Sequence, residues 1–187
     1  IQIQKSASGT MVFDLWYSGS DRFDVRLTTP SGTFGPYAAP EADDGSDFVR
    51  TAVFDYYHFG PDSDFFEATN GKREISLYIG GPTGTYTIEL IGRQVTSGTF
   101  DGTLNPASIF QGESSQNRFL TFVAPGSIWD GASAKYNVCP GDYVIRQDWV
   151  DVDGFTRGIF GEGDVGEIWT GSSVGPTFDG RTGVDVC

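Results

Sequence analysis

Apolar and polar residues alternate along two segments near the start of the chain. Segment 10–17, TMVFDLWY, places four large side chains on one face of an extended strand and Val12 and Trp16 on the other, so we expect cover on both faces. Segment 22–28, RFDVRLT, alternates apolar with charged or polar residues, as in a strand with one face in water. The turn-forming residues 18–21 between them predict that the two strands pair as a hairpin.

Further extended segments follow at short intervals. Predicted strands lie at 48–56, 73–79 and 85–92. Loops rich in Gly, Pro and Asp are predicted at 35–47, 60–64 and 80–84. No segment before residue 104 has a convincing helical period. Five or more short strands with this punctuation predict an all-β fold, an antiparallel β-sandwich or jelly roll.

The character of the chain changes near residues 104–126, which are polar and rich in turn-forming residues. We therefore predict two parts: a sandwich domain over residues 1–103, and short strands of an incomplete second sheet over residues 104–187. The candidate strands of the second part are the short runs 119–124, 136–139 and 142–145. The chain opens without a Met or a signal segment and stops after an apolar run, as we expect for a piece of a longer protein.

The composition narrows the choice of partner. The 187 residues include 25 Asp and Glu against 12 Lys and Arg, which gives a formal net charge of −13. This acidity argues against binding to nucleic acid or to an anionic membrane, because both need clustered Lys and Arg. Aromatic residues make up 14% of the chain, so a packed core is expected. The sequence has no run of about 18 apolar residues that would span a bilayer.

Residues that carry nucleophilic or metal chemistry are few. Cys139 and Cys187 either form one disulfide or stay as two buried thiols, and they are too few for a four-ligand zinc site. A Ser-His-Asp site needs a base, but the one histidine, His58, follows an apolar strand among aromatic residues. Because no Gly-x-Ser-x-Gly elbow occurs, we favour a structural His58 packed by tyrosines. We predict no catalytic, cofactor-binding or metal-binding residue in this chain.

Carboxylates are abundant, and several groups of them could offer oxygen ligands to Ca²⁺. The groups are Asp43–Asp47, Asp62–Asp64, and Asp153-Gly154 together with Asp164. None follows the twelve-residue EF-hand pattern, so we prefer solvated acidic loops and leave Ca²⁺ binding open. Paired carboxylates could also serve a glycosidase, but among 25 acidic residues such pairs arise by chance.

Two further patterns have simpler interpretations. Residues 161–166, GEGDVG, match Gly-x-Gly-x-x-Gly by letters, but the segment is acidic and lacks a strand–helix–strand context, so we predict a flexible loop. Aromatic residues of the sandwich could form a platform on which sugars stack, although core packing is the preferred use. These residues are Trp16, Tyr17, Tyr37, Tyr56 and Tyr57.

The most specific motif lies near the end of the chain. The run SSVGPTFDGR, residues 172–181, belongs to the segment 169–187. It resembles a loop of the subtilisin-like serine proteases, in which Ser-Ser-x-Gly-Pro, often followed by Thr-x-Asp-Gly-Arg, leads into a core strand. Residues 127–139 resemble, less closely, the strand and turn that precede this loop in the family.

The first part of the chain resembles the β-sandwich or jelly-roll domain that some bacterial subtilisin-like proteases carry late in the catalytic domain. The matching runs are FDVRLTTPSG at 23–32, GTYTIELIG at 84–92 and GTFDG at 98–102. Each run is a loose motif, and their order carries the resemblance. Together with the loop motif, the resemblance covers most of the chain.

The resemblance implies an accessory, non-catalytic part of a secreted protease, placed outside the cell or in the cell envelope. The family's catalytic Asp and His and its oxyanion Asn belong before residue 1, and its nucleophilic Ser belongs after Cys187. Ser172 and Ser173 lie in the loop motif, so no catalytic role is carried over to them. The implied role is to brace the protease domain or to shape substrate access, with the rest of its own chain as partner and a protein as the parent's substrate.

Two features depart from the family pattern. Cys187 stands where the family usually has a small residue, and residues 140–168 form a longer, Asp- and Gly-rich link. Two alternatives without a protease connection also stay open. One is an adhesion sandwich that binds carbohydrate or calcium, and the other is a glycosidase on a jelly roll, which needs two carboxylates facing one groove.

Overall fold

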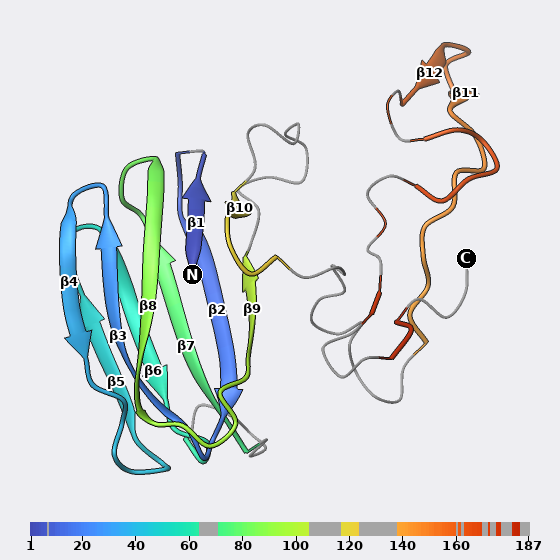
Figure 1. Ribbon diagram of the computed structural model, residues 1–187. Coiled ribbons are helices and arrows are strands. Elements are labelled where there is room, and N and C mark those ends of the chain that lie inside the picture. The colour runs from blue at the N-terminus through green and yellow to red at the C-terminus, as the bar shows by residue number, and fades with distance from the viewer. Residues whose placement is uncertain are drawn as a thin grey trace. The chain divides into compact units, whose positions relative to one another are not determined.

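The structure is a computed structural model of the chain (Figure 1). It describes residues 1–6, 8–63, 71–104, 117–123, 138–159, 161, 163–169, 172, 175–176 and 181–183. The chain divides into two compact units, Ile1–Val123 and Ala124–Cys187. The sequence places the boundary earlier, between residues 103 and 104.

The first unit is an antiparallel β-sandwich of two five-stranded sheets, so the all-β fold predicted from the sequence is confirmed (Figure 1). The first sheet consists, in spatial order, of β10 (Arg118–Phe119), β1 (Gln2–Lys5), β8 (Gly84–Gln94), β3 (Arg22–Thr29) and β4 (Gly32–Tyr37). The second sheet consists of β5 (Ser46–Arg50), β6 (Phe54–Phe59), β7 (Lys72–Ile79), β2 (Met11–Ser18) and β9 (Phe100–Leu104).

Alternate residues of these strands fill the space between the sheets. The predicted inward faces of β2 and β3 are confirmed, since their apolar side chains are at most 6% exposed. Each fully buried aliphatic or phenyl side chain contributes about 1.5–3 kcal/mol to folding. The core consists mainly of Ile3, Met11, Phe13, Leu15, Tyr17, Phe23, Val25, Leu27, Phe54, Tyr56, Ile75, Leu77, Ile79, Tyr86 and Ile88.

The predicted hairpin between segments 10–17 and 22–28 is wrong. β2 pairs with β7 and β9, whereas β3 pairs with β4 and β8, so the two strands lie in opposite sheets. The connection bends at Ser18 and Asp21, where the Asp21 N–H donates to the Ser18 carbonyl at 3.0 Å. Each strand turns a face of large apolar side chains inward, and this crossing lets the two inward faces meet in the same core. Such crossings are typical of Greek-key and jelly-roll sandwiches.

The predicted single strand 48–56 is two strands. β5 and β6 form a hairpin whose register runs from Arg50↔Asp55 to Ser46↔Phe59. The Thr51 hydroxyl closes the turn, because it donates to the Phe54 carbonyl at 2.9 Å and accepts the N–H of Phe54 at 3.0 Å. The turn contains neither Gly nor Pro, so the alternation of side chains hides it. β4 also extends to Tyr37, into the predicted loop 35–47.

The described part of the second unit is an antiparallel ribbon. β11 (Asp148–Val150) pairs with β12 (Thr156–Gly158), and a bridge joins Tyr143 to Ile168. The predicted strand 142–145 is therefore reduced to this bridge, and the predicted strand 119–124 contributes Phe119 to β10. Within 136–139, residues 136 and 137 lie outside the described part of the chain. None of the described residues forms a helix long and apolar enough to cross a membrane.

Candidate functional site

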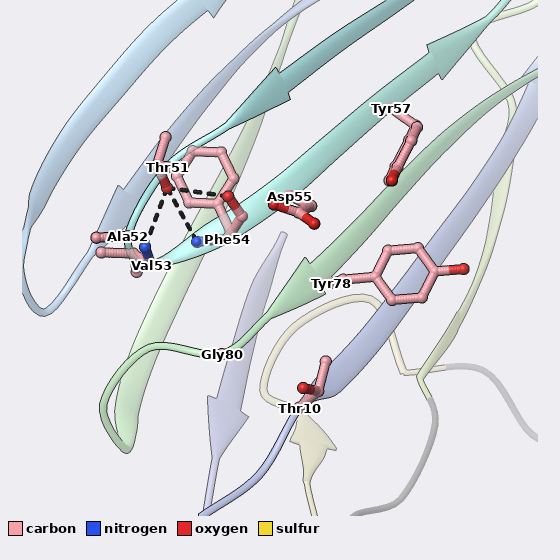
Figure 2. Close-up of a pocket in the computed structure, with 9 residues that line it drawn as sticks. All are labelled: Thr10, Thr51, Ala52, Val53, Phe54, Asp55, Tyr57, Tyr78 and Gly80. Atoms are coloured by element: carbon pink, nitrogen blue, oxygen red, sulfur yellow. Dashed lines mark hydrogen bonds between the residues drawn. The ribbon is translucent and has the colours of Figure 1, made fainter.

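A pocket of about 350 Å³ lies beside the turn that joins β5 to β6 (Figure 2). The turn forms one wall, and the side chains of β6 and β7 form another. Asp55 and Tyr57 of β6 share one face of the second sheet with Tyr78 of β7, because Asp55 lies directly opposite Tyr78 in the register. The pocket is lined by Thr10, Thr51, Ala52, Val53, Phe54, Asp55, Tyr57, Tyr78 and Gly80.

Three aromatic side chains cross the outer face of the second sheet next to this pocket. Phe48 of β5 lies opposite Tyr57 of β6, with ring centroids 4.7 Å apart. The ring of Tyr57 then meets the ring of Tyr78 edge-on at 5.8 Å. Phe48 is 50% exposed and Tyr78 is 45% exposed. We call Phe48, Tyr57 and Tyr78 the aromatic strip.

An ion pair joins the strip to the pocket. The Arg50 guanidinium donates two hydrogen bonds to the Asp55 carboxylate, each 2.9 Å long. These bonds from Arg50 lower the pKa of Asp55, so its carboxylate stays ionised. Arg50 also lies over the ring of Phe48, 5.2 Å from its centroid. The polar pair is thus held in one orientation beside the aromatic rings.

The structure places the predicted sugar-platform residues on both faces of the sandwich. Tyr17 and Tyr56 are 1% exposed in the core, and Tyr37 packs there against Tyr56 at 5.0 Å. Trp16 and Tyr57 lie on the outer face, as the alternation along their strands requires. Sequence reasoning missed Phe48 and Tyr78 as surface aromatics. Only the pairing of β5, β6 and β7 brings those two rings beside Tyr57.

His58 is buried on the inner face of β6. The hydroxyl of Tyr17 lies 2.6 Å from its Nε2, and the hydroxyl of Tyr56 lies 2.8 Å from its Nδ1. Burial and then the positive charge of Arg73 lower the pKa of His58 to about 3, so the ring is neutral at physiological pH. With no exposed surface and both ring nitrogens engaged, His58 is placed as a structural bridge between tyrosines.

The acidic loop around Asp43 is engaged by arginine. Arg73 is fully buried and donates to Asp43 Oδ1 at 2.8 Å and to the carbonyl of Pro40 at 3.0 Å. Arg22 lies 3.6 Å from the same carboxylate oxygen. Two arginines therefore engage one carboxylate oxygen, that of Asp43, within the group Asp43–Asp47 that the sequence offers to Ca²⁺. Of Asp62–Asp64, Asp64 lies outside the described residues.

The acidic and glycine-rich candidates of the second unit lie in its ribbon. The Asp151 carboxylate organises the turn before β12, accepting the N–H groups of Asp153 and Phe155 at 3.0 and 2.9 Å. Within the segment 161–166, the N–H of Gly166 donates to the Val144 carbonyl at 2.9 Å. No group of three or more possible metal ligands comes together among the described residues.

A carboxylate pair that the sequence did not single out lies on the outer face of the second sheet. Ser76 of β7, which is directly opposite Asp14 of β2, donates its hydroxyl to Asp14 at 2.5 Å. Glu74, the next outward residue of β7, is 8% exposed and its Oε2 has no hydrogen-bond partner. Burial and then the charge of Asp14 raise the pKa of Glu74 to about 7. Neither carboxylate lines the pocket beside the β5–β6 turn.

The loop motif of residues 172–181 is described in part, at Ser172, Gly175, Pro176 and Arg181. The hydroxyl of Ser172 accepts the N–H of Asp142 at 3.2 Å. A Cβ on Gly175 would overlap the carbonyl oxygen of Thr182, so a side chain at position 175 is excluded. Ser173 lies outside the described residues, and so does Cys187, so neither the disulfide with the buried Cys139 nor the alternative of two buried thiols is tested.

Comparison with known proteins shows a likeness to a solved structure. No family model matches the chain, and no curated protein matches it. The structure described as that of the Clostridium perfringens CspB protease is similar, with a TM-score of 0.53 and 16% sequence identity. The likeness covers 76% of this chain and 29% of that chain. At this identity it shows a common fold, and this chain spans less than a third of the length of the protein it matches.

Proposed function

We propose that the chain is an accessory, non-catalytic part of a secreted subtilisin-like serine protease. In this role the sandwich braces the protease domain or shapes the access of protein substrate to it. The second unit is the segment with which the chain returns to the protease core. The partner is the remainder of the same protease chain.

The observation that carries the proposal is the fold likeness to a protease over 76% of this chain. It agrees with the order of sandwich motifs at 23–32, 84–92 and 98–102, followed by the loop motif at 172–181. Sequence motifs and fold likeness depend on different properties of the chain. Their agreement supports a relation to proteases more strongly than either does alone.

The second unit exposes apolar side chains that need cover. In its ribbon Ile145 is 74% exposed, Val150 is 67% exposed and Val152 is fully exposed. A two-stranded ribbon has no core of its own and is marginally stable in water. Packing against the rest of a protease core would remove these side chains from water. The close approach of Gly175 to Thr182 also fits a loop motif that specifies glycine at this position.

The test uses the natural protein that contains this chain, with and without the sandwich unit Ile1–Val123. A bracing role predicts that excision lowers the Tm of the protease, and a gating role predicts that it changes the ratio of casein to short-peptide hydrolysis. A protease whose Tm and substrate ratio are both unchanged by excision would contradict the proposal. The isolated chain of 187 residues is expected to hydrolyse no casein. Hydrolysis by the isolated chain that a serine-directed inhibitor stops would contradict the non-catalytic role.

A further inference from the structure

The aromatic strip and the pocket beside it have the composition of a binding site rather than of a bare apolar surface. Two of the three rings are about half exposed, and they adjoin a pocket near the lower end of the volume range of small-molecule sites. The strip crosses three adjacent strands of the sandwich. A ligand there would meet a surface that is already in its binding geometry, so little conformational entropy is lost on binding.

The polar groups at this surface suit hydroxyl groups. Arg50 engages both oxygens of Asp55, but each oxygen keeps a lone pair that can accept an O–H from a ligand. The pocket lining also includes three residues that carry a hydroxyl, namely Thr10, Tyr57 and Tyr78. The Thr51 hydroxyl, in contrast, already makes three hydrogen bonds within its turn and acts as a rigid wall.

These features select a ligand with an apolar C–H face and a rim of hydroxyl groups. A purely apolar ligand would remove water from the Arg50–Asp55 pair and offer no hydrogen bond to its remaining donors and acceptors. An anionic ligand would be repelled by a chain of net charge −13, and the arginine beside the strip is already neutralised by Asp55. A pyranose ring meets both requirements, because its C–H face packs on an aromatic ring while its hydroxyls hydrogen-bond at the edge.

We propose that the aromatic strip Phe48–Tyr57–Tyr78 and the adjoining pocket bind a neutral oligosaccharide. One sugar occupies the pocket beside Asp55 and contacts Tyr78, and its neighbours lie along the exposed edges of Tyr57 and Phe48, whose ring faces pack on each other. This inference does not depend on the relation to proteases, since it rests on the geometry of the second sheet alone.

The test is native affinity electrophoresis of the full 187-residue chain through gels that contain one neutral polysaccharide each. The panel consists of xyloglucan, glucomannan, galactomannan, laminarin, dextran and soluble starch. The proposal predicts that at least one polysaccharide retards the chain. Tyr78→Ala and Tyr57→Ala each weaken that retardation about tenfold, because an aromatic ring that contacts the ligand is lost. Asp55→Asn weakens it as well.

Phe122→Ala is the matched control, since Phe122 is 73% exposed and does not line the pocket. It is expected to leave retardation unchanged, and near-ultraviolet circular dichroism checks that every variant is folded. If none of the six polysaccharides slows the migration of the wild-type chain, the proposal is wrong. Retardation that survives the double variant Tyr57→Ala/Tyr78→Ala overturns it too. If Tyr78→Ala instead abolishes association with another protein while no glycan binds, the strip is a protein interface and the proposal is wrong.

Discussion

The guanidinium of Arg73 lies 2.8 Å from the carboxylate of Asp43, although the Arg73 side chain is fully buried and that of Asp43 is 58% exposed. Arg73 also donates to the carbonyls of Gly19 and Pro40, at 3.2 and 3.0 Å. One buried side chain therefore holds β7 to the connection between β2 and β3 and to the loop that follows β4. This arrangement gives the acidic loop a structural role.

Replacing Arg73 tests that role. Arg73→Ala leaves a cavity and removes the donor from two carbonyls and a carboxylate, so we expect it to lower the free energy of unfolding by about 2–5 kcal/mol. Arg26→Ala is the control, because Arg26 pairs with Glu89 at the surface and its loss costs about 1 kcal/mol or less. Urea unfolding measures the loss of unfolding free energy in each of the two variants. Equal costs for the two variants would show that the buried arginine does not organise these loops.

The stability of the sandwich is also expected to depend strongly on the carboxylate of Asp21. It is fully buried and accepts the backbone N–H groups of Ser97 and Gly98 at 2.9 and 2.8 Å. Burial works against the charged form, but these N–H groups outweigh it and lower the pKa of Asp21. Asp21→Ala is expected to cost about 2–4 kcal/mol, because the loop loses charge-assisted hydrogen bonds. The exposed Asp44→Ala should be near neutral, and a thermal scan in which both variants match the wild type would refute this account.

His58 predicts acid sensitivity. Its pKa is about 3 in the folded protein against an ordinary value of 6.5, so the unfolded chain binds a proton that the folded chain does not. Stability from this group is complete above pH 6.5 and is lost as the pH falls toward 3, by on the order of 1.4 kcal/mol per pH unit. His58→Gln should flatten that part of the profile. Parallel profiles for wild type and variant between pH 4 and 7 would contradict a buried neutral histidine.

For Glu74 we predict the opposite dependence of stability on pH: its contribution is lost as the pH rises. Its pKa is about 7 in the folded protein against an ordinary value of 4.5, so the folded chain holds the proton more tightly than the unfolded chain. Its contribution is fully present below about pH 4.5 and is lost as the pH rises through 7. Glu74→Gln should therefore be more stable than the wild type at pH 8, by on the order of 2–3 kcal/mol, and equal to it at pH 4. A difference that does not depend on pH would refute the raised pKa.

The alternation of side chains along a strand predicts well which face of the strand is buried, but it predicts poorly with which other strands it pairs. Alternation identified the inward side chains of β2 and β3, because a half-buried strand repeats every second residue. It could not show that these strands belong to opposite sheets, since either arrangement buries the same faces. The turn at Thr51 also escaped prediction, because a threonine hydroxyl replaces the usual glycine or proline there.

The candidate site escaped prediction for the same reason. Tyr57 was recognised as an aromatic of the sandwich, but Phe48 and Tyr78 lie on other strands. They join Tyr57 only through the registers of β5 with β6 and of β6 with β7. The carboxylates of Asp14 and Glu74 likewise become neighbours only through the register of β2 with β7. Cross-strand relations of this kind depend on topology, which the sequence of a single strand does not carry.

The central claim, that the chain is a non-catalytic part of a serine protease, is tested most directly by labelling with a fluorophosphonate. The natural protein that contains the chain and the purified chain of 187 residues are each treated with the probe, and mass spectrometry locates the label. The account predicts that the natural protein is labelled on a serine outside residues 1–187 and that the purified chain takes up no label. A natural protein that takes up no label and hydrolyses no protein, or a label on a serine within residues 1–187, would contradict it.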